Sequence, residues 1–189
     1  MAALRLFTFA ALLGMITACS LTNRTPIIVE ETTPESRPIV YYYFASGDDF
    51  PAGSVVILAD SLVLSPTAIP GSADVAANIQ AALQAAIADP RNAWTSNDLT
   101  LTSVTFDNGH AEVVLSGEIS GAGDIVRIAA RMQFLLTVFA EPAVQTATIT
   151  LNGESIGNLG ISHSSEAKPA DYAYTRAEIE QFIAENALS

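Results

Sequence analysis

The chain has 189 residues, of which half are hydrophobic and 15% are charged; this is the composition of a folded protein, and the length allows one domain or two small ones. The formal net charge of −12 repels phosphate backbones and anionic lipid head groups, which argues against nucleic acid as a partner and against membrane binding through the domain's own charge. The single cysteine excludes an internal disulfide.

The first eighteen residues have the pattern of an export signal. A short start with one basic residue, Arg5, precedes an almost wholly apolar run from Leu6 to Ile16. Such a run followed by small residues is typical of a secretory signal. It is shorter than the about 20 apolar residues that a membrane-spanning helix needs. We therefore predict a signal peptide over residues 1–18.

Ile16, Thr17, Ala18 and Cys19 together resemble the bacterial lipobox, with Ile16 in place of the more usual Leu and Thr17 in place of Ala or Ser. The resemblance implies cleavage before Cys19 and transfer of a diacylglycerol, with acyl chains such as palmitate, to its thiol. Two or three acyl chains anchor a protein stably, whereas one holds it only marginally. We expect the mature chain to be fixed to the outer side of a bacterial membrane. The alternatives are an uncleaved signal anchor and a plainly secreted protein.

Residues 19–38 read as the lipidated cysteine and a tether. Pro, Thr and Glu dominate this stretch, and such a mixture favours an extended, hydrated spacer. The apolar segment Ile27 to Val29 interrupts the polarity, so part of the tether could dock on the domain as an added edge strand. The mature chain keeps 7 basic and 20 acidic side chains, because the leader carries only Arg5.

The remainder, residues 39–189, is predicted to be one domain, because we find no sustained repeat and no clear second core. Runs of β-branched and aromatic residues and alternating apolar residues predict strands, at 39–45, 55–64, 99–106, 111–116, 143–151 and 154–159. Apolar residues recurring at helical spacing predict helices, at 73–88, at 124–139 and from Thr175 onward.

Turn and cap residues mark the ends of these elements. Asn108 with Gly109 is a strong hairpin signal, because this pair suits the positive φ angles of a type I′ turn. We expect Ser72 to be the N-cap of the first helix. Thr175 with Glu178 forms the capping box of the last one.

The element order is β-β-α-β-β-α-β-(β)-α. Helices interspersed with hairpins predict an α+β fold, with the helices packed on one face of a mixed or antiparallel sheet.

Several segments in this order resemble the GerMN domain of sporulation and spore germination proteins. The resemblance covers about residues 39–188, and it is carried by segments 40–44, 81–87, 104–117, 149–154 and 174–179. The chain departs from the family's Gly-Pro and Leu-rich turn after the first helix, where it has Asp89 to Trp94, and in its Gly-rich loop, Glu118 to Gly123. The resemblance implies an envelope-associated, non-catalytic domain. Related folds build ring-like assemblies, and the family offers no catalytic residues to carry over.

Catalytic and metal-binding patterns are sparse. The two histidines, His110 and His163, are isolated, and no Gly-x-Ser-x-Gly elbow is present. With Cys19 assigned to lipid, the chain lacks zinc-ligand spacing. We predict that the chain is not an enzyme and has no metal and no cofactor. Two alternatives stay open: a wall-related accessory enzyme using carboxylates such as Glu118, and a small-ligand or calcium binder using Asp48 and Asp49.

Two aromatic residues are candidates for partner contact. Tyr42 lies in the aromatic run Tyr41 to Phe44, which places rings on both faces of one strand. Trp94 is the best single candidate for an exposed anchor. The alternative, which we weigh above it, is that Trp94 packs against its own domain.

Together these observations predict a lipid-anchored, non-catalytic interaction or assembly module of the cell envelope. Its membrane contact is the lipid on Cys19. Its partners are envelope proteins or wall polymer, bound through an exposed sheet edge or aromatic residues. The sequence leaves the identity of the partner, the oligomeric state and the choice of inner or outer membrane open.

Overall fold

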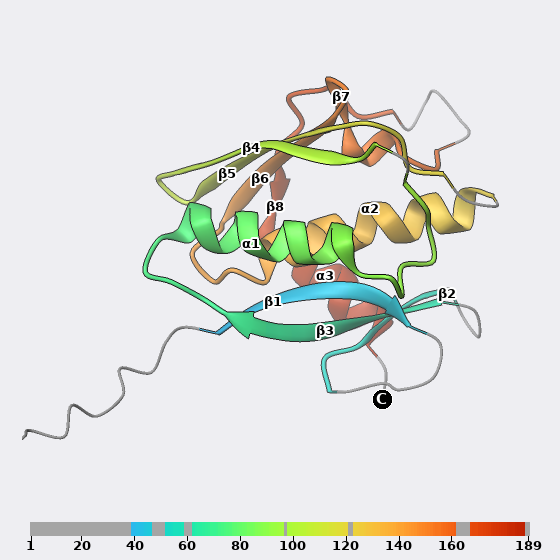
Figure 1. Ribbon diagram of the computed structural model, residues 1–189, viewed down its shortest axis with the longest axis horizontal. Coiled ribbons are helices and arrows are strands. Elements are labelled where there is room, and N and C mark those ends of the chain that lie inside the picture. The colour runs from blue at the N-terminus through green and yellow to red at the C-terminus, as the bar shows by residue number, and fades with distance from the viewer. Residues whose placement is uncertain are drawn as a thin grey trace, which may run out of the picture. The chain divides into compact units, whose positions relative to one another are not determined.

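The computed structural model describes residues 39–46, 52–58, 62–96, 98–120, 123–161 and 167–187 (Figure 1). The predicted signal peptide (1–18), the lipidation site Cys19, the tether, Asp48, Asp49 and His163 lie outside these residues. Within the described part, no helix is long and apolar enough to cross a bilayer.

The described strands form two sheets. The smaller one has the antiparallel order β1-β3-β2, built from β1 (Ile39–Ser46), β3 (Leu62–Pro70) and β2 (Val55–Leu58). The larger one has the order β4-β5-β6-β7, built from β4 (Thr100–Asp107), β5 (His110–Ser116), β6 (Thr146–Leu151) and β7 (Glu154–Ser155). A short strand, β8 (Tyr174–Thr175), also pairs with β6. The larger sheet is mixed, because β5 and β6 run parallel while its other pairs are antiparallel.

Helices α1 (Val75–Ala88) and α2 (Asp124–Phe139) lie between the two sheets (Figure 1). Helix α1 packs against β4 and β1, and α2 packs against β1 and β6. A short 3-10 helix, η1 (Ile156–Asn158), follows β7, and α3 (Arg176–Asn186) packs against α2 and β2. The predicted α+β class, with helices packed against a mixed sheet, is confirmed. The second sheet on the other side of the helices was not predicted.

The placement of α2 between two sheets explains its burial. A helix that covers one sheet has one apolar stripe, whereas a helix enclosed on several sides is buried all round. Residues 132–139 of α2 are all buried, including the polar Gln133 and Thr137. Ile125, in the first turn of the helix, is 46% exposed.

The chain crosses from β5 through α2 into the parallel strand β6, the crossover connection that parallel strands need. Val113 of β5 pairs with Ile149 of β6 in register, and both side chains are fully buried. The loop after β5 and the turn after β6 therefore lie at the same end of the sheet. This end carries a polar hollow.

Both Asn-Gly turns have the expected geometry. Asn108 and Gly109 have φ angles of 48° and 83°, and Asn152 and Gly153 have 53° and 83°. Positive φ at both central residues is the signature of the type I′ turn, whose twist matches that of the flanking strands. The two turns set the register of β4 on β5 and of β6 on β7.

The predicted strand at 55–64 is two strands, β2 and β3, and β3 continues through Pro66 to Pro70. Pro66 is tolerated because β2 pairs with β3 only as far as Leu64, so no third strand needs a donor at Pro66. On its other side Pro66 pairs with Tyr43, whose backbone N–H donates to Thr137 Oγ1 of α2 at 3.1 Å.

The cap of α1 differs from the prediction and the cap of α3 agrees with it. Asp74, not Ser72, is the N-cap of α1, and its carboxylate accepts from the backbone N–H of Ala77. Ser72 lies outside the helix and donates its backbone N–H to Asn78 Oδ1 at 2.7 Å. The capping box of Thr175 and Glu178 is present at α3.

Candidate functional site

The outer edge of β4 is a candidate interaction surface. Within the described part of the chain, β4 pairs with β5 on one side and with no strand on the other. Charged side chains, lysine above all, and proline protect edge strands from pairing. Residues 100–106 contain none of these. A bulge between Leu101 and Ser103 is the one irregularity in its pairing with β5. An extended segment of another chain can add to such an edge.

Hydroxyl side chains cover the face of the larger sheet that points away from the helices. Ala111, Val113 and Leu115 of β5 are fully buried, so the alternate residues point outward. The hydroxyl group of Ser116 lies 2.9 Å from that of Thr100 and 3.2 Å from that of Thr102. His110 is half-buried, and its Nδ1 lies 2.8 Å from Thr146 Oγ1.

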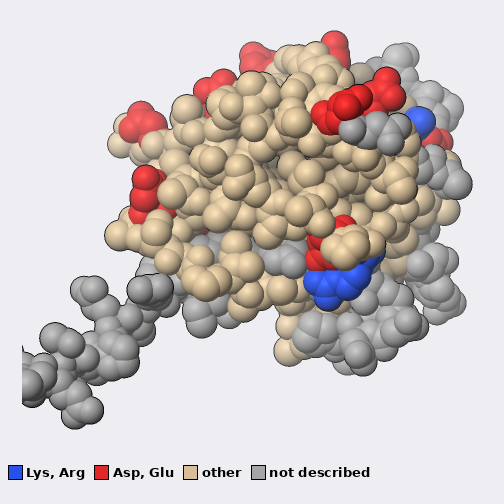
Figure 2. Space-filling model, viewed as in Figure 1, with Lys and Arg blue, Asp and Glu red and all other residues tan. Residues whose placement is uncertain are grey.

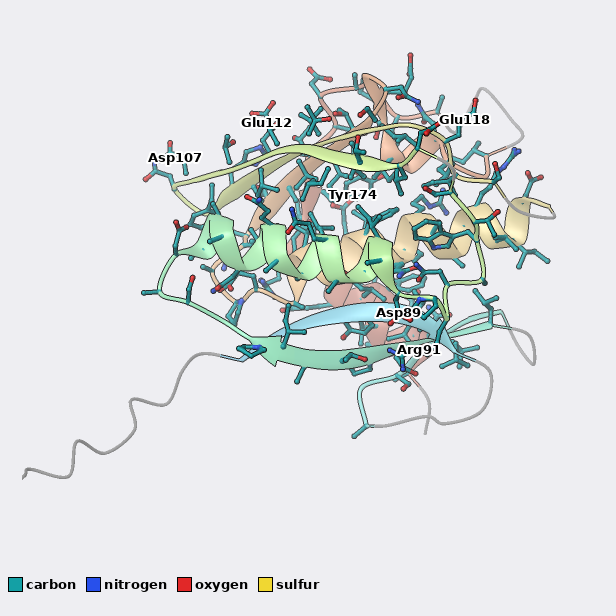
Figure 3. All side chains as sticks on the ribbon, viewed as in Figure 1. Asp89, Arg91, Asp107, Glu112, Glu118 and Tyr174 are labelled. Carbon is teal, nitrogen blue, oxygen red and sulfur yellow. The ribbon has the colours of Figure 1, made fainter. Side chains whose placement is uncertain are left out.

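Acidic side chains lie along the same sheet. Figure 3 places Asp107 at the β4–β5 turn, Glu112 along β5 and Glu118 beyond the far end of the strands. All three are exposed. Figure 2 shows acidic groups along the upper and left borders of this face of the molecule, and a basic patch next to an acidic group at its lower side. The surroundings of the β4 edge are therefore negatively charged.

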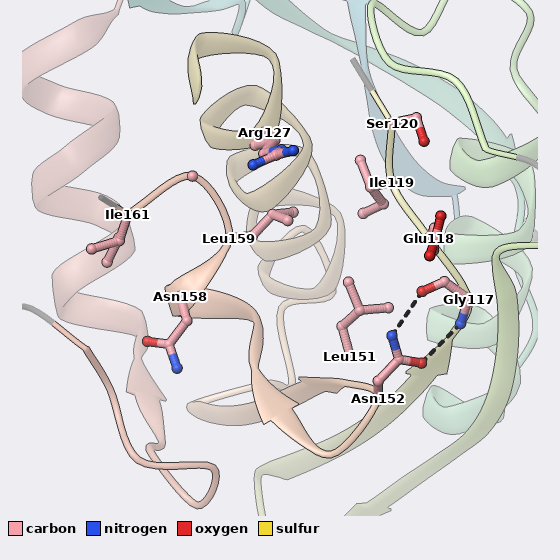
Figure 4. Close-up of a pocket in the computed structure, with 11 residues that line it drawn as sticks. Gly117, Glu118, Ile119, Ser120, Arg127, Leu151, Asn152, Asn158, Leu159 and Ile161 are labelled. Atoms are coloured by element: carbon pink, nitrogen blue, oxygen red, sulfur yellow. Dashed lines mark hydrogen bonds between the residues drawn. The ribbon is translucent and has the colours of Figure 1, made fainter. Parts of the chain in front are cut away.

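A polar hollow of about 510 Å³ opens at the end of the larger sheet (Figure 4). It lies where parallel strands β5 and β6 end and where α2 begins, which is the usual place for ligands in parallel sheets. The half-buried Leu151 and Leu159 and the buried Ile119 supply apolar surface. The other lining residues are Gly117, Glu118, Ser120, Arg127, Asn152, Asn158, Gly160 and Ile161.

Hydrogen bonds at both ends hold the segment that carries Glu118. Asn152 donates its side-chain Nδ2 to the backbone oxygen of Gly117 at 2.8 Å and accepts the Gly117 N–H at 3.0 Å. Ser120 exchanges two backbone hydrogen bonds of 2.8 Å with Thr95. Between these points Ile119 is buried, with 7% of its surface exposed. The backbone under Glu118 is therefore fixed.

Gly117 is required in this rim. Its φ angle is +112°, and an added Cβ would lie 2.2 Å from the backbone oxygen of Asp98. No real Cβ tolerates a contact of that length, so only glycine fits here. The close approach joins the rim to the segment that leads into β4.

The Asn152 hydrogen bonds give a direct test of rim stability. We expect Asn152→Gly to lower the free energy of unfolding by about 1–2 kcal/mol, because two hydrogen bonds of typical net value are lost while glycine keeps the positive φ. Asn108→Gly is the matched control, since Asn108 occupies the same turn position but its side chain bonds only to the neighbouring Asp107. Urea denaturation of both variants is the measurement, and equal losses would contradict the role of Asn152.

The charged groups at the hollow are Glu118 and Arg127. Glu118 is exposed, and among the described residues its carboxylate has no hydrogen-bond or ion-pair partner. The side chain of Arg127 is 48% exposed and lies at the limit of an ion pair, 4.0 Å from Asp124. Figure 4 shows Ile119 between the two charged side chains, with Leu159 and Leu151 below. Both groups are thus accessible to a ligand.

A second, smaller hollow of about 250 Å³ lies between α2, α3 and the segment before β8. Its polar groups already bind one another. The Tyr172 hydroxyl donates to Glu178 Oε1 at 2.6 Å, and Lys168 Nζ lies 4.3 Å above the Tyr172 ring. The hydrogen bond from Tyr172 is the main reason why the pKa of Glu178 lies below its ordinary value. These pairings make this hollow part of the packing of α3.

Trp94, the candidate for an exposed anchor, is buried, with 3% of its surface exposed. Its indole Nε1 donates to Gln133 Oε1 at 2.7 Å, and its ring lies 5.7 Å from that of Phe134. Gln133 in turn donates to Asn92 Oδ1 at 2.8 Å. Its role as an anchor fails because α2 supplies both an apolar contact and a buried acceptor for the indole. The alternative, packing against its own domain, is confirmed.

The other candidate site residues lie partly or wholly outside the described part of the chain. Tyr42, in β1, pairs with Thr67 of β3, and the side chain of Tyr42 lies outside the described part. Cys19, Asp48, Asp49 and His163 also lie outside it. Among the described residues, no three His, Cys, Asp or Glu side chains are grouped as a metal site would need.

Sequence reasoning singled out Glu118 but did not connect it with Arg127 or Asn152. The signal that could have found them is the parallel crossover, because a strand-helix-strand unit brings the loop after its first strand, the start of its helix and the end of its second strand together.

No protein-family model matches the sequence, and no curated protein matches it. Two solved structures are similar. One is a presumed lipoprotein from Clostridium perfringens, 15% identical, with a TM-score of 0.41, over 77% of this chain and 91% of that one. The other holds the tandem GerMN domains of the sporulation protein GerM from Bacillus subtilis, 13% identical, with a TM-score of 0.47, over 74% of this chain and 46% of that one. The assignment of this chain to the GerMN family stays a prediction.

Proposed function

We propose that this chain is a lipid-anchored, non-catalytic interaction module of the bacterial envelope, which binds an extended segment of a partner protein along the outer edge of β4. The observation that carries the proposal is that edge: an eight-residue strand, uncharged from Thr100 to Phe106, with no strand paired to its outer side in the described part. Strand addition supplies main-chain hydrogen bonds along the whole edge.

The charge around the edge selects a basic partner. Asp98 lies just before β4, Asp107 is its last residue, and Glu112 lies on the adjacent strand β5. A second copy of this chain would bring the same acidic groups against one another, which is unfavourable. A segment with an uncharged centre and Lys or Arg at its ends complements the edge. Wall polymer, the other partner class predicted from sequence, has no long peptide backbone that could pair with this edge.

The anchor follows from the lipobox-like residues Ile16 to Cys19. Acyl chains on Cys19 fix the mature chain to the membrane, and the Pro- and Thr-rich residues 20–38 separate the domain from it. The domain's own acidity keeps it off anionic lipid. Anchoring on the extracytoplasmic side confines the search for a partner to envelope proteins.

Site-specific photocrosslinking tests the edge. A photoreactive phenylalanine analogue in place of Ser103, on β4, is compared with the same analogue in place of Glu185, an exposed residue of α3. We expect a crosslinked partner from intact envelopes at Ser103 and not at Glu185. Raising the salt concentration should lower the yield, because it screens the charges that steer a basic segment.

Two outcomes would contradict the proposal. One is the same crosslinked products from both positions. The other is a crosslink within the chain, from position 103 to the apolar segment Ile27 to Val29, which would mean that the tether covers the edge.

The wall-related enzyme remains a weaker candidate. It needs two close carboxyl groups, at least one with a raised pKa. The pKa of Glu178 is lowered, mainly by the hydrogen bond from the Tyr172 hydroxyl, which is the opposite of what a general acid requires.

A further inference from the structure

The polar hollow at the end of β5 and β6 has three features of a built binding site: volume, opposite charges and a fixed rim. Its volume of about 510 Å³ lies within the range of about 300–1,000 Å³ that small-molecule sites occupy. It opens at the carboxyl ends of the two parallel strands.

The two charged groups select a ligand that carries both charges. A simple anion would be attracted by Arg127 but repelled by Glu118. A simple cation would be attracted by Glu118 but repelled by Arg127. A ligand with a carboxylate at one end and an ammonium at the other satisfies both groups. The guanidinium presents a planar fork that suits a carboxylate, and the Glu118 carboxylate accepts hydrogen bonds from an ammonium group.

The competing interaction within the protein is weak. Asp124 stands 4.0 Å from the Arg127 guanidinium, and the side chains of both residues are about half exposed. Exposed ion pairs of this kind contribute about 0–1 kcal/mol. A ligand carboxylate can therefore take the place of Asp124 at little loss.

The apolar lining of the hollow limits the chemistry of the part of the ligand that connects its carboxylate to its ammonium group. Ile119, Leu151 and Leu159 offer aliphatic contact. The described lining residues include no aromatic ring, so the hollow does not offer the stacking surface that nucleobases use. Short aliphatic side chains on a flexible backbone match this surface.

The rim is formed in advance. Asn152 holds Gly117 by two hydrogen bonds, Thr95 holds Ser120 by two more, and Ile119 is buried between them. On the opposite side, Gly160 packs so closely on α2 that an added Cβ would lie 2.9 Å from the backbone oxygen of Asp124. Preformed walls reduce the entropy that is lost when a ligand binds.

We propose that this hollow binds a short zwitterionic peptide with small aliphatic side chains, its carboxylate on Arg127 and its ammonium group on Glu118. The site is independent of the lipid anchor and of the partner segment on the β4 edge. It makes the protein a receptor for free peptide ends, a role distinct from strand addition.

The test uses the full chain purified in detergent and L-alanyl-L-alanine as the probe, with binding followed by ligand-observed and backbone NMR. We expect saturable binding, with shifts at residues 117–120 and 158–161. The N-acetylated and the C-amidated dipeptides each lack one charge, and each should bind at least about tenfold more weakly, since one charge-assisted hydrogen bond is lost. D-Alanyl-D-alanine distinguishes a wall-peptide source from a protein-derived one, and a preference for either enantiomer supports the site.

Variants assign the two ends. Glu118→Gln should weaken binding of the dipeptide about tenfold and leave the affinity for the N-acetylated form unchanged. Arg127→Gln should also weaken binding of the dipeptide about tenfold, and it should leave the affinity for the C-amidated form unchanged. Glu112→Gln is the matched control, because it removes an exposed carboxylate from the outer face of β5, away from the hollow. Circular dichroism checks that each variant is folded.

Three results would overturn the proposal. They are no binding at millimolar dipeptide, equal binding of the free and blocked dipeptides, and loss of affinity in Glu112→Gln equal to that in Glu118→Gln. The crosslinking at Ser103 probes the β4 edge, so its result does not decide whether the hollow binds the dipeptide. The two proposals can therefore fail independently.

Discussion

Replacing Trp94 with alanine is expected to lower the free energy of unfolding by about 3–5 kcal/mol, as typically found when a large buried aromatic side chain is removed. The indole is 3% exposed and lies beside Phe134 in the core. Its loss leaves a cavity and also leaves Gln133 Oε1, a fully buried acceptor, without its donor. If Trp94 were an exposed interaction anchor, its replacement by alanine would hardly change the free energy of unfolding.

Two further variants separate the cavity from the hydrogen bond. Trp94→Phe keeps most of the ring and is expected to lower the free energy of unfolding by about 1–3 kcal/mol, the penalty for one unsatisfied buried group. Adding Gln133→Leu removes the acceptor but also the donor to Asn92, so the two substitutions should couple rather than add. Urea unfolding followed by far-ultraviolet circular dichroism measures all of them. A loss below about 1 kcal/mol in Trp94→Ala would contradict the packing described above.

Replacing Cys19 with serine is expected to abolish incorporation of lipid completely. In the proposed lipidation the thiol forms the thioether to diacylglycerol, and Cys19 is the one cysteine of the chain, so no other side chain can replace it. Cells fed an alkyne analogue of palmitate should label the native chain and not Cys19→Ser. Ser20→Ala is the matched control and should keep its label, because it changes the neighbouring residue and spares the thiol.

The mass of the native chain completes this test. We expect the mature protein to lack residues 1–18 and to carry the added mass of the acyl groups on Cys19. A native chain that keeps residues 1–18, or a label that persists in Cys19→Ser, would contradict lipidation and with it the proposed anchoring.

Local features were predictable because their causes lie within a few residues. The Asn108–Gly109 turn needs only two positive φ angles, and the capping box needs only Thr175 and Glu178 three residues apart. The bounds of α2 follow likewise from its neighbours in sequence, with Glu141 and Pro142 just beyond its end. In these segments propensity and tertiary contacts agree.

Features that depend on distant partners were not predictable in the same way. The division of the strands into two sheets depends on β1 pairing with β3, from Ile39 opposite Pro70 to Ser46 opposite Val63, and no local signal distinguishes this from one continuous sheet. Whether Trp94 is exposed depends on Gln133, 39 residues later. Glu118 was recognised as a candidate from sequence, but its proximity to Arg127 depends on the crossover.

The enclosure of α2 between two sheets bears on how the chain acquires its structure during synthesis. Strands β1 to β5 precede α2 in the sequence, yet β1 reaches the core through the Tyr43 contact with Thr137, 94 residues later. Until residue 139 has left the ribosome, the earlier strands can pack only on α1 and on one another, and they lack the helix that fills the space between the two sheets. Contacts of such long sequence separation slow folding. We therefore expect the core to close only after α2 has been synthesised.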